Sequence, residues 1–320
     1  MVQKLIIDAD PGIADTLAVM TAMADPSVEL LAVTATGGAV SGTQATRNLH
    51  YLIELIDPVR HPRIGQCERP AAINDALPDI TSKWRHLNGE EGLGNAKVPM
   101  ADLHKRRESA RLIVDVARQH PGEVRLLTLG PFSNLALAAD FDPQLCEYLH
   151  SVISLGGSVQ MGGDVTAAAE FNIWADPQAA RTVCQLPLRK TLVPLDVSRA
   201  PVLSFDDVDA MCSFFRPTAV SEFAIDLLQF AIRGQRQYAA TEGIPLNAVA
   251  ALAVAVGAEA FQQEDALLDI ETAGELTYGM TVLDRRATQT QGRNFSLVTS
   301  IDDVGVVDYF ARAVRSICYS

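Results

Sequence analysis

The stretch LIIDADPGIAD, which runs from Leu5 to Asp15, decides the fold. It opens with three consecutive apolar residues, and such a run is typical of a buried strand in a parallel sheet. Pro11 and Gly12 then end the strand in a tight turn, and from Asp15 the apolar residues follow a helical spacing. A strand, a turn and a helix in this order predict an α/β fold with a ligand site at the carboxyl end of the strand.

Three carboxylates crowd this turn, because Asp8, Asp10 and Asp15 stand within eight residues. Buried carboxylates repel one another, so that either one of them holds a proton or a cation lies among them. Oxygen ligands of this kind favour Ca²⁺ or Mg²⁺ over zinc. A lone pair of aspartates would usually do no more than cap the turn and the following helix. Three acids next to Pro-Gly at the end of a strand instead favour a cation or catalytic site.

The composition argues against several classes of partner. Of the 320 residues 48% are hydrophobic, which suffices for a large core, and the net charge of −13 argues against binding to nucleic acid or to an anionic membrane. We recognise neither a signal peptide nor an apolar run long enough to span a bilayer. Five scattered cysteines without a C-x-x-C pattern suit reduced thiols. We therefore expect a cytoplasmic protein.

Strand-like and helical segments alternate along the whole chain. Further buried strands are expected at 28–36, 124–128, 152–157 and 190–194, and helices at 43–56, 107–119 and over most of 204–238. The polar region 74–105 is expected to be a long irregular loop. Since no linker or internal repeat is apparent, we expect residues 1–320 to form a single α/β domain, Rossmann-like, with a mostly parallel central sheet flanked by helices.

Several motifs resemble those of the inosine/uridine-preferring nucleoside hydrolases. One is D-x-D-P-G-x-D-D, in which Ala14 here replaces the first acid of the final pair. The block AEFNIWADP at 169–177, the turn LGPFSN at 129–134, and the segments 275–277 and 279–284, which match a late pair of strands, also resemble that family. The resemblance covers nearly the whole chain and points to a divergent member. It implies the nucleoside hydrolase fold and hydrolysis of an N-glycosidic bond.

The resemblance also implies a calcium site. Its ligands would be the carboxylates of Asp10 and Asp15, the backbone carbonyl of Leu129 and the side chain of Asn247. The family has an aspartate where Asn247 stands, and an amide oxygen can keep the coordination while it lowers the ligand charge by one. Because fewer charged ligands bind calcium more weakly, we expect a weakened site.

The implied substrate is a nucleoside or a related ribosyl compound. By resemblance, Glu170 and Asn172 bind the sugar hydroxyls, and a carboxylate and an amide suit a polyol. Asp164 replaces a family asparagine on the sugar or base side, and Asn247 is expected to contact the substrate as well. Asp10 is the expected general base, which takes a proton from a calcium-activated water.

Other family residues are replaced. Leu246 stands where the family has the histidine that assists the departing base, and leucine cannot transfer a proton. Ala39 replaces a ribose-binding asparagine, and Asn88 replaces a histidine in the segment NGEEGLG beside the pocket. Together with Ala14, these changes leave the activity open.

Three hypotheses remain. The first is a divergent N-glycoside hydrolase, which acts on an altered sugar or on a base activated by stacking on Trp84 or Trp174. The second is a pseudoenzyme that binds a nucleoside or ribose without cleaving it. The third is a structural subunit of a hetero-oligomer. The family is commonly dimeric or tetrameric, so the resemblance implies a homodimer or homotetramer.

Overall fold

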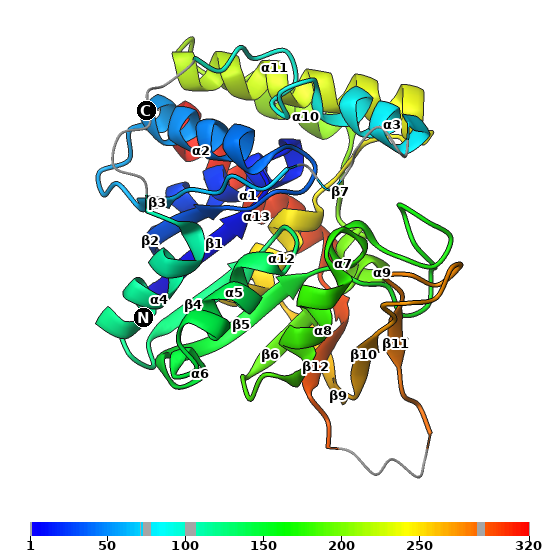
Figure 1. The fold of residues 1–320 in the computed structure, drawn as a ribbon. Helices are drawn as coiled ribbons and strands as arrows, with labels where there is room; N and C mark the ends of the chain where they lie inside the picture. Colours follow the sequence, from blue (N-terminus) through cyan, green and yellow to red (C-terminus); the bar gives the residue numbers. More distant parts are fainter. Residues whose placement is uncertain (1, 71, 73–77, 100–106, 287–291, 320) are drawn as a thin grey trace.

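A central, mostly parallel sheet organises the molecule. The computed structural model describes residues 2–70, 72, 78–99, 107–286 and 292–319, and in this part of the chain eight strands pair in the order β3-β2-β1-β4-β5-β6-β12-β9 (Figure 1). β9 runs antiparallel to β12, whereas the other neighbours are parallel. The expected α/β fold is confirmed. The strands are β1 (Gln3–Ala9), β2 (Val28–Ala35), β3 (Arg63–Gly65), β4 (Val124–Thr128), β5 (Leu149–Leu155), β6 (Lys190–Val193), β9 (Phe261–Ala266) and β12 (Phe295–Ile301).

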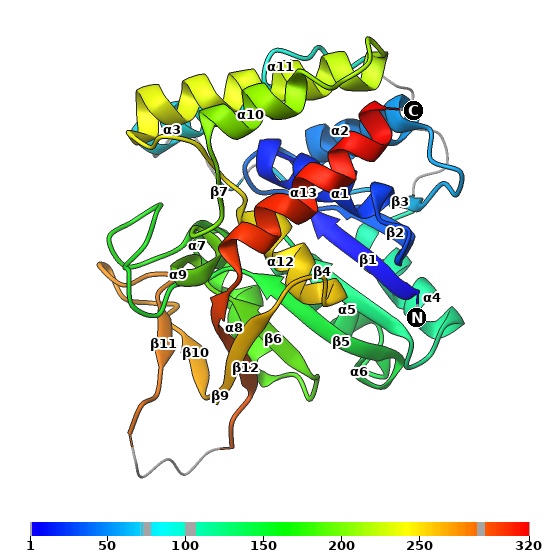
Figure 2. The same cartoon turned by 180° about the vertical axis from the view of Figure 1, so that it is seen from behind.

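Helices cover both faces of this sheet (Figures 1 and 2). One face carries α1 (Ile13–Ala24), α2 (Gly42–Ile56), α12 (Asn247–Val256) and α13 (Asp303–Cys318). The other carries α4 (Ser109–Gln119), α5 (Ser133–Phe141) and α8 (Pro177–Gln185). Shorter elements complete the fold: α6 (Leu145–Tyr148), α7 (Phe171–Ala175), α9 (Leu195–Ser198), α10 (Phe205–Cys212), and the pairs β7 (Val202–Leu203) with β8 (Ile244–Pro245) and β10 (Leu268–Ile270) with β11 (Thr281–Leu283).

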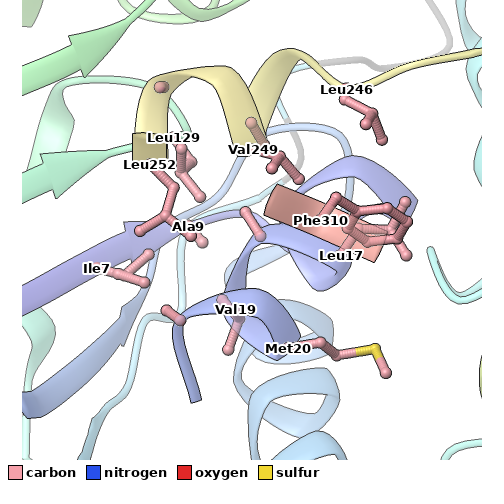
Figure 3. Packing of buried hydrophobic residues seen from close by; sticks show 14 of the residues in the cluster. Ile7, Ala9, Leu17, Val19, Met20, Leu129, Leu246, Val249, Leu252 and Phe310 are labelled. Carbon is pink, nitrogen blue, oxygen red and sulfur yellow. The ribbon is translucent and has the colours of Figure 1, made fainter. Parts of the chain in front are cut away.

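The apolar side chains of β1 alternate between two buried clusters, one on each face of the sheet. Leu5, Ile7 and Ala9 belong to the cluster that contains α1, α12 and α13, whereas Ile6 belongs to the cluster with α4 and α5. Figure 3 shows the first cluster, in which residues of β1 pack with Leu17 of α1, Val249 of α12 and Phe310 of α13. The continuous apolar run at the start of the chain thus follows from burial of β1 on both faces.

The order of the strands reverses beside β1. From β1 the chain continues outward through β2 and β3, and it then returns to the opposite side of β1 with β4. Open α/β sheets bind ligands at such a switch point, outside the carboxyl ends of the strands. Asp10 follows β1 and Leu129 follows β4, so both residues lie at this point.

Two expectations about local structure are wrong. The region 74–105 contains a helix, α3 (Pro78–Asn88), although residues 74–77 and 100–105 lie outside the described part. Its polar composition hides the helix, because few apolar residues mark a buried face.

The expected strand at 275–277 is a turn, and β11 pairs instead with β10. Thr277 accepts a hydrogen bond from the N–H of Met280, which closes the turn before β11 begins.

The described ranges contain no helix long and apolar enough to cross a membrane. All five cysteines are free of disulfides in the described part of the chain.

Candidate active site

A pocket of about 180 Å³ opens at the switch point. It brings together seven residues for which the sequence suggested a role in metal or substrate binding: Asp10, Asp15, Leu129, Asp164, Glu170, Asn172 and Asn247. These residues come from four regions of the chain, at 10–15, 129, 164–172 and 247. Trp174, which the sequence offered as a stacking residue, does not line the pocket. The remaining walls come from α3, from α11 (Ala219–Gly234) and from the π-helix η1 (Gln235–Ala239) that continues it.

Asp10 and Asp15 lie side by side on the floor of this pocket. The backbone N–H of Asp10 donates to Oδ2 of Asp15 at 3.2 Å, and the N–H of Ala39 donates to Oδ2 of Asp10 at 2.5 Å. Their residues are only 5% and 7% exposed. Burial, followed by repulsion from Asp15, holds the pKa of Asp10 well above its ordinary value, and burial raises the pKa of Asp15 to about 7. No lysine or arginine of the described residues forms an ion pair with either.

Two glycines make room for the Asp10 carboxylate. A Cβ atom at Gly38 would lie 2.0 Å from Oδ2 of Asp10, and one at Gly130 would lie 2.5 Å from Oδ1. Any side chain at either position would therefore displace the carboxylate. The backbone of two neighbouring strand ends forms a close-fitting cradle around Asp10.

Asp8 does not join this pair, although the sequence grouped the three acids. Its Oδ1 accepts hydrogen bonds from Thr34 Oγ1 at 2.6 Å and from Asn134 Nδ2 at 2.8 Å, and Asp8 does not line the pocket. Burial raises its pKa to about 7. Asp8 thus ties β1 to β2 and α5, which makes it a structural residue.

The oxygen donors around Asp10 fit a hard cation. Asn247 begins α12, and its Oδ1 is buried without a hydrogen-bond partner among the described residues. An unpaired buried oxygen is costly, and a cation would satisfy it. Together with two carboxylates and the Leu129 carbonyl, this donor set suits Ca²⁺ better than zinc. In the described ranges, no three His, Cys, Asp or Glu side chains come together as a metal cluster.

Asn172 is fixed by the carbonyls of two strand ends. Its Nδ2 donates to the carbonyl of Leu129 at 2.6 Å and to that of Leu155 at 3.0 Å. Both N–H groups of the amide are therefore in use, and its oxygen remains for a ligand. The Leu129 carbonyl keeps one lone pair for a cation.

Glu170 caps α7 and lines the pocket at the same time. Its two oxygens accept hydrogen bonds from the backbone N–H groups of Gly157, Asn172 and Ile173, at 2.7, 3.0 and 3.2 Å. Burial and then repulsion from Asp164 raise its pKa to about 8 in spite of these donors. Asp164 accepts from the N–H of Phe171 at 3.0 Å, and burial raises its pKa too. Helix capping and ligand binding are thus compatible roles here.

Leu246 does not face the pocket. It is 1% exposed and belongs to the buried cluster that contains Leu17 and Phe310 (Figure 3), while its neighbours Pro245 and Asn247 line the pocket. No proton donor is therefore offered from this position. Ala39 and Ala14 do line the pocket, where methyl groups make no hydrogen bonds to a sugar.

The helix α3 forms a wall that the sequence did not predict. Asn88 at its end accepts a hydrogen bond from the N–H of Ile13 at 3.0 Å, which caps α1 beside the acidic pair. Trp84 lines the pocket and packs on Phe171, with ring centroids 4.6 Å apart. His86 lies outside the pocket and stacks on Tyr238.

Lys83 and Arg199 also line the pocket, and the sequence did not single them out. Residues 193–197 (VPLDV) also resemble the nucleoside hydrolases, and Arg199 comes two residues after them. A cation this close to such a segment is the signal that could have identified Arg199. Lys83 lies on the unpredicted helix α3, so no pattern in the sequence placed it in this pocket.

Solved structures share this fold. The purine-preferring ribonucleoside hydrolase from Gardnerella vaginalis superposes with a TM-score of 0.87 at 22% identity over 99% of both chains. An inosine-guanosine nucleoside hydrolase gives a TM-score of 0.85 at 26% identity over 100% of this chain and 99% of the other. The fold and its strand-end pocket thus define an α/β enzyme of the nucleoside hydrolase class.

Sequence comparison then places the chain within that class. The model of the inosine-uridine preferring nucleoside hydrolases matches residues 5–308. The pyrimidine-specific ribonucleoside hydrolase RihA of Enterobacter sp. (strain 638) is 30% identical over 313 residues, which are 97% of each chain. This chain belongs to the inosine-uridine preferring nucleoside hydrolase family, whose members are N-glycosyl hydrolases, and the resemblance seen in the sequence is confirmed.

Proposed function

We propose that the protein hydrolyses the N-glycosidic bond of a nucleoside or a related ribosyl compound with the help of a bound calcium ion. The carrying observation is the pair of buried carboxylates, Asp10 and Asp15, beside the unpartnered oxygen of Asn247 in one pocket. These groups and the Leu129 carbonyl would hold the ion. Since one of the four ligands is an amide in place of a carboxylate, binding is weaker than at a site with three acids.

Asp10 is the general base of the proposed reaction. Calcium, when bound, lowers the pKa of a water molecule and orients the sugar hydroxyls. Asp10 takes the proton of the attacking water, and its carboxylate is oriented for this by the N–H of Ala39 and by the glycine cradle. Glu170 and the free oxygen of Asn172 accept hydrogen bonds from sugar hydroxyls.

The departing base receives little help from an acid. Leu246 is buried in the core, and the pocket presents Trp84 as its only tryptophan among the described residues. We therefore expect activity toward leaving groups that are stable as anions or that can stack on Trp84. The alanines at positions 14 and 39 make a sugar with fewer hydroxyls, such as a deoxyribosyl group, an acceptable substrate.

The test is release of reducing sugar from a panel of ribonucleosides and 2′-deoxyribonucleosides in the presence of calcium. We expect turnover of at least one member, and a loss of about 100-fold or more in Asp10→Asn. Asp57→Asn, a change at an exposed acid that does not line the pocket, is the matched control. A flat result across the panel, with Asp10→Asn indistinguishable from the parent, would contradict the proposal.

A second candidate is a nucleoside- or ribose-binding pseudoenzyme. It is favoured by the absence of a leaving-group acid at position 246 and of polar side chains at positions 14 and 39. Calorimetric titration with ribose or a nucleoside separates the two functions. Binding without turnover over the whole panel would support the pseudoenzyme.

Three broader properties complete the proposal. We infer that residues 1–320 act as a single domain, because β1 and β12 from opposite parts of the chain lie in one sheet. We also infer a cytoplasmic location from the free thiols, and assembly into a homodimer or homotetramer. Nucleic acids and membranes are not expected partners of a chain with a net charge of −13.

A further inference from the structure

Two cationic side chains line a pocket whose other charged residues are acids. Arg199 follows α9 and is half-buried, whereas Lys83 lies on α3 and is exposed at the rim. The acids of the same pocket are Asp10, Asp15, Asp164 and Glu170. Asp164 is the acid on which both cations act electrostatically, so Arg199 and Lys83 are close to the same end of the pocket.

Hydrogen bonds hold the backbone on both sides of Arg199. The carboxylate of Asp196 in α9 accepts hydrogen bonds from the backbone N–H groups of Val159, Gln160 and Met161, each at 2.8 Å. The carbonyl of Pro201 accepts from the N–H of Leu246 at 2.9 Å, which ties the other side of Arg199 to the start of α12. The backbone that carries this guanidinium is therefore held on both sides.

The nearby carboxylates have their own partners. Asp164 accepts from the N–H of Phe171, and Glu170 accepts from three backbone N–H groups. Neither Lys83 nor Arg199 forms an ion pair within 4.0 Å or a hydrogen bond with its side chain in the described part of the chain. An arginine keeps its charge and presents five N–H donors, so its unpaired guanidinium in a concave site favours an anion, bound in bidentate fashion.

We propose that Arg199 and Lys83 form a subsite for an anionic group of the substrate, so that the enzyme prefers N-ribosides that carry a phosphate or a carboxylate. This inference rests on the proposed function and names the class of substrate. An anionic group on either the sugar or the base accepts hydrogen bonds from the guanidinium of Arg199. The ammonium group of Lys83 contacts the same anion from the exposed edge of the pocket. The positive potential of the two cations also offsets the repulsion between Asp164 and the anionic group of the substrate.

The experiment compares three substrates that differ in where the charge lies. Uridine is neutral, uridine 5′-monophosphate carries its charge on the sugar, and orotidine carries it on the base. We expect kcat/KM for one of the anionic substrates to exceed that for uridine by about tenfold or more, mainly through KM, because a bound anion contributes equally in the ground and transition states. The preferred substrate shows whether the anion is a phosphate or a carboxylate.

Variants assign the effect to the subsite. Arg199→Gln should lower kcat/KM for the preferred anionic substrate by about tenfold or more and change that for uridine by less than about threefold. Lys83→Gln should act in the same direction with a smaller effect, since its side chain is exposed. Arg60→Gln, which removes an exposed cation paired with Glu29, is the control for net charge. Equal losses for all three substrates, or a parent enzyme that prefers uridine, would overturn the proposal.

A binding measurement keeps this inference separate from the proposed reaction. Calorimetric titration of Asp10→Asn with uridine 5′-monophosphate, orotidine and uridine requires no turnover. Tighter binding of an anionic ligand that is lost in the double variant with Arg199→Gln supports the subsite even if no compound is cleaved. Equal binding of all three ligands contradicts it even if uridine is hydrolysed.

Discussion

Asp10 owes its position to the backbone around it. Its carboxylate lies between Gly38 and Gly130, and the N–H of Ala39 donates to it from the end of β2. No cation of the described residues holds it in place. The geometry of the proposed general base thus depends on the absence of a Cβ atom at Gly38 and at Gly130. The sequence alone does not reveal this dependence.

Gly130→Ala tests this dependence. Its Cβ would lie 2.5 Å from Oδ1 of Asp10 and 2.7 Å from Cγ2 of Thr36, so the carboxylate must move. A displacement on the order of 1 Å at a catalytic group lowers kcat by about 100-fold. Gly292→Ala, where a Cβ meets nothing within 4 Å, is the control and should retain the parent's rate. A fully active Gly130→Ala enzyme would show that the position of Asp10 is not critical.

The amide at position 247 should limit the affinity for calcium. Asn247→Asp adds a charged ligand at the oxygen that has no partner, and we expect roughly tenfold tighter binding. Asn247→Ala should weaken binding, because it removes that oxygen altogether. Isothermal titration calorimetry with calcium measures both changes. If both variants bind calcium as the parent does, Asn247 is not a ligand.

Glu170 should make the stability of the metal-free protein depend on pH. Its pKa rises from an ordinary 4.5 to about 8 on folding, so the folded chain binds more protons than the unfolded chain between these values. The free energy of unfolding therefore falls as the pH rises, by up to about 1.4 kcal/mol per pH unit from this group. Urea denaturation between about pH 5 and about pH 8 should show a steeper fall in the parent than in Glu170→Gln. Parallel curves would contradict this.

At the scale of elements, the loop at 88–94 is tied to the turn that follows β1. Asn48 of α2 is buried, and its Nδ2 donates to the carbonyl of Pro11 at 3.0 Å and to that of Glu91 at 2.7 Å. Gly92, with a φ of 89°, approaches the carbonyl of Pro11 so closely that a Cβ would lie 2.8 Å away. Asn48 thus joins the loop at 88–94 to the turn that carries Asp10 and Asp15.

Asn48→Ala should release this loop. The buried carbonyl of Pro11 and the part-buried carbonyl of Glu91 lose their donor, and a buried group left unpaired costs on the order of 1–3 kcal/mol. Hydrogen exchange followed by mass spectrometry should show faster exchange in residues 88–94, with little change in β4 and β5. Gln44→Ala removes only the contact to Oδ1 of Asn48 and is the control. Unchanged protection of the loop would show that other contacts hold it.

The sequence predicted the elements whose residues are buried and regular. The middle of β1, all of β4 and most of α2 and α4 lie where the apolar patterns placed them, because burial on a sheet or on one helical face leaves a pattern. The helix α3 was missed since, apart from Pro78, only Ile80, Trp84 and Leu87 of its eleven residues are apolar. The convergence of Asp10, Glu170 and Asn247 came from resemblance alone. Distant segments meet through tertiary structure, which periodicity does not encode.

The molecule as a whole presents exposed apolar side chains beside β11. Leu276 is 85% exposed, and Tyr278, Met280 and Val282 are exposed nearby. If the chain forms a homodimer or homotetramer, this surface is a candidate contact. We expect sedimentation velocity to give two or four times the mass of 34.4 kDa, and the double variant Leu276→Asp, Met280→Asp to lower it. A monomeric parent would refute the assembly, and an unaffected oligomer would place the contact elsewhere.

The position of β12 has a consequence for biosynthesis. This strand fills the gap between β6 and β9, and α13 after it packs against α1, yet both are translated after every other strand. While they are still inside the ribosome, the emerging chain shows an open edge on β6 and an uncovered apolar face on α1. The nascent protein cannot bury these surfaces until β12 and α13 have emerged, so we expect the preceding interval of synthesis to be the one most prone to aggregation.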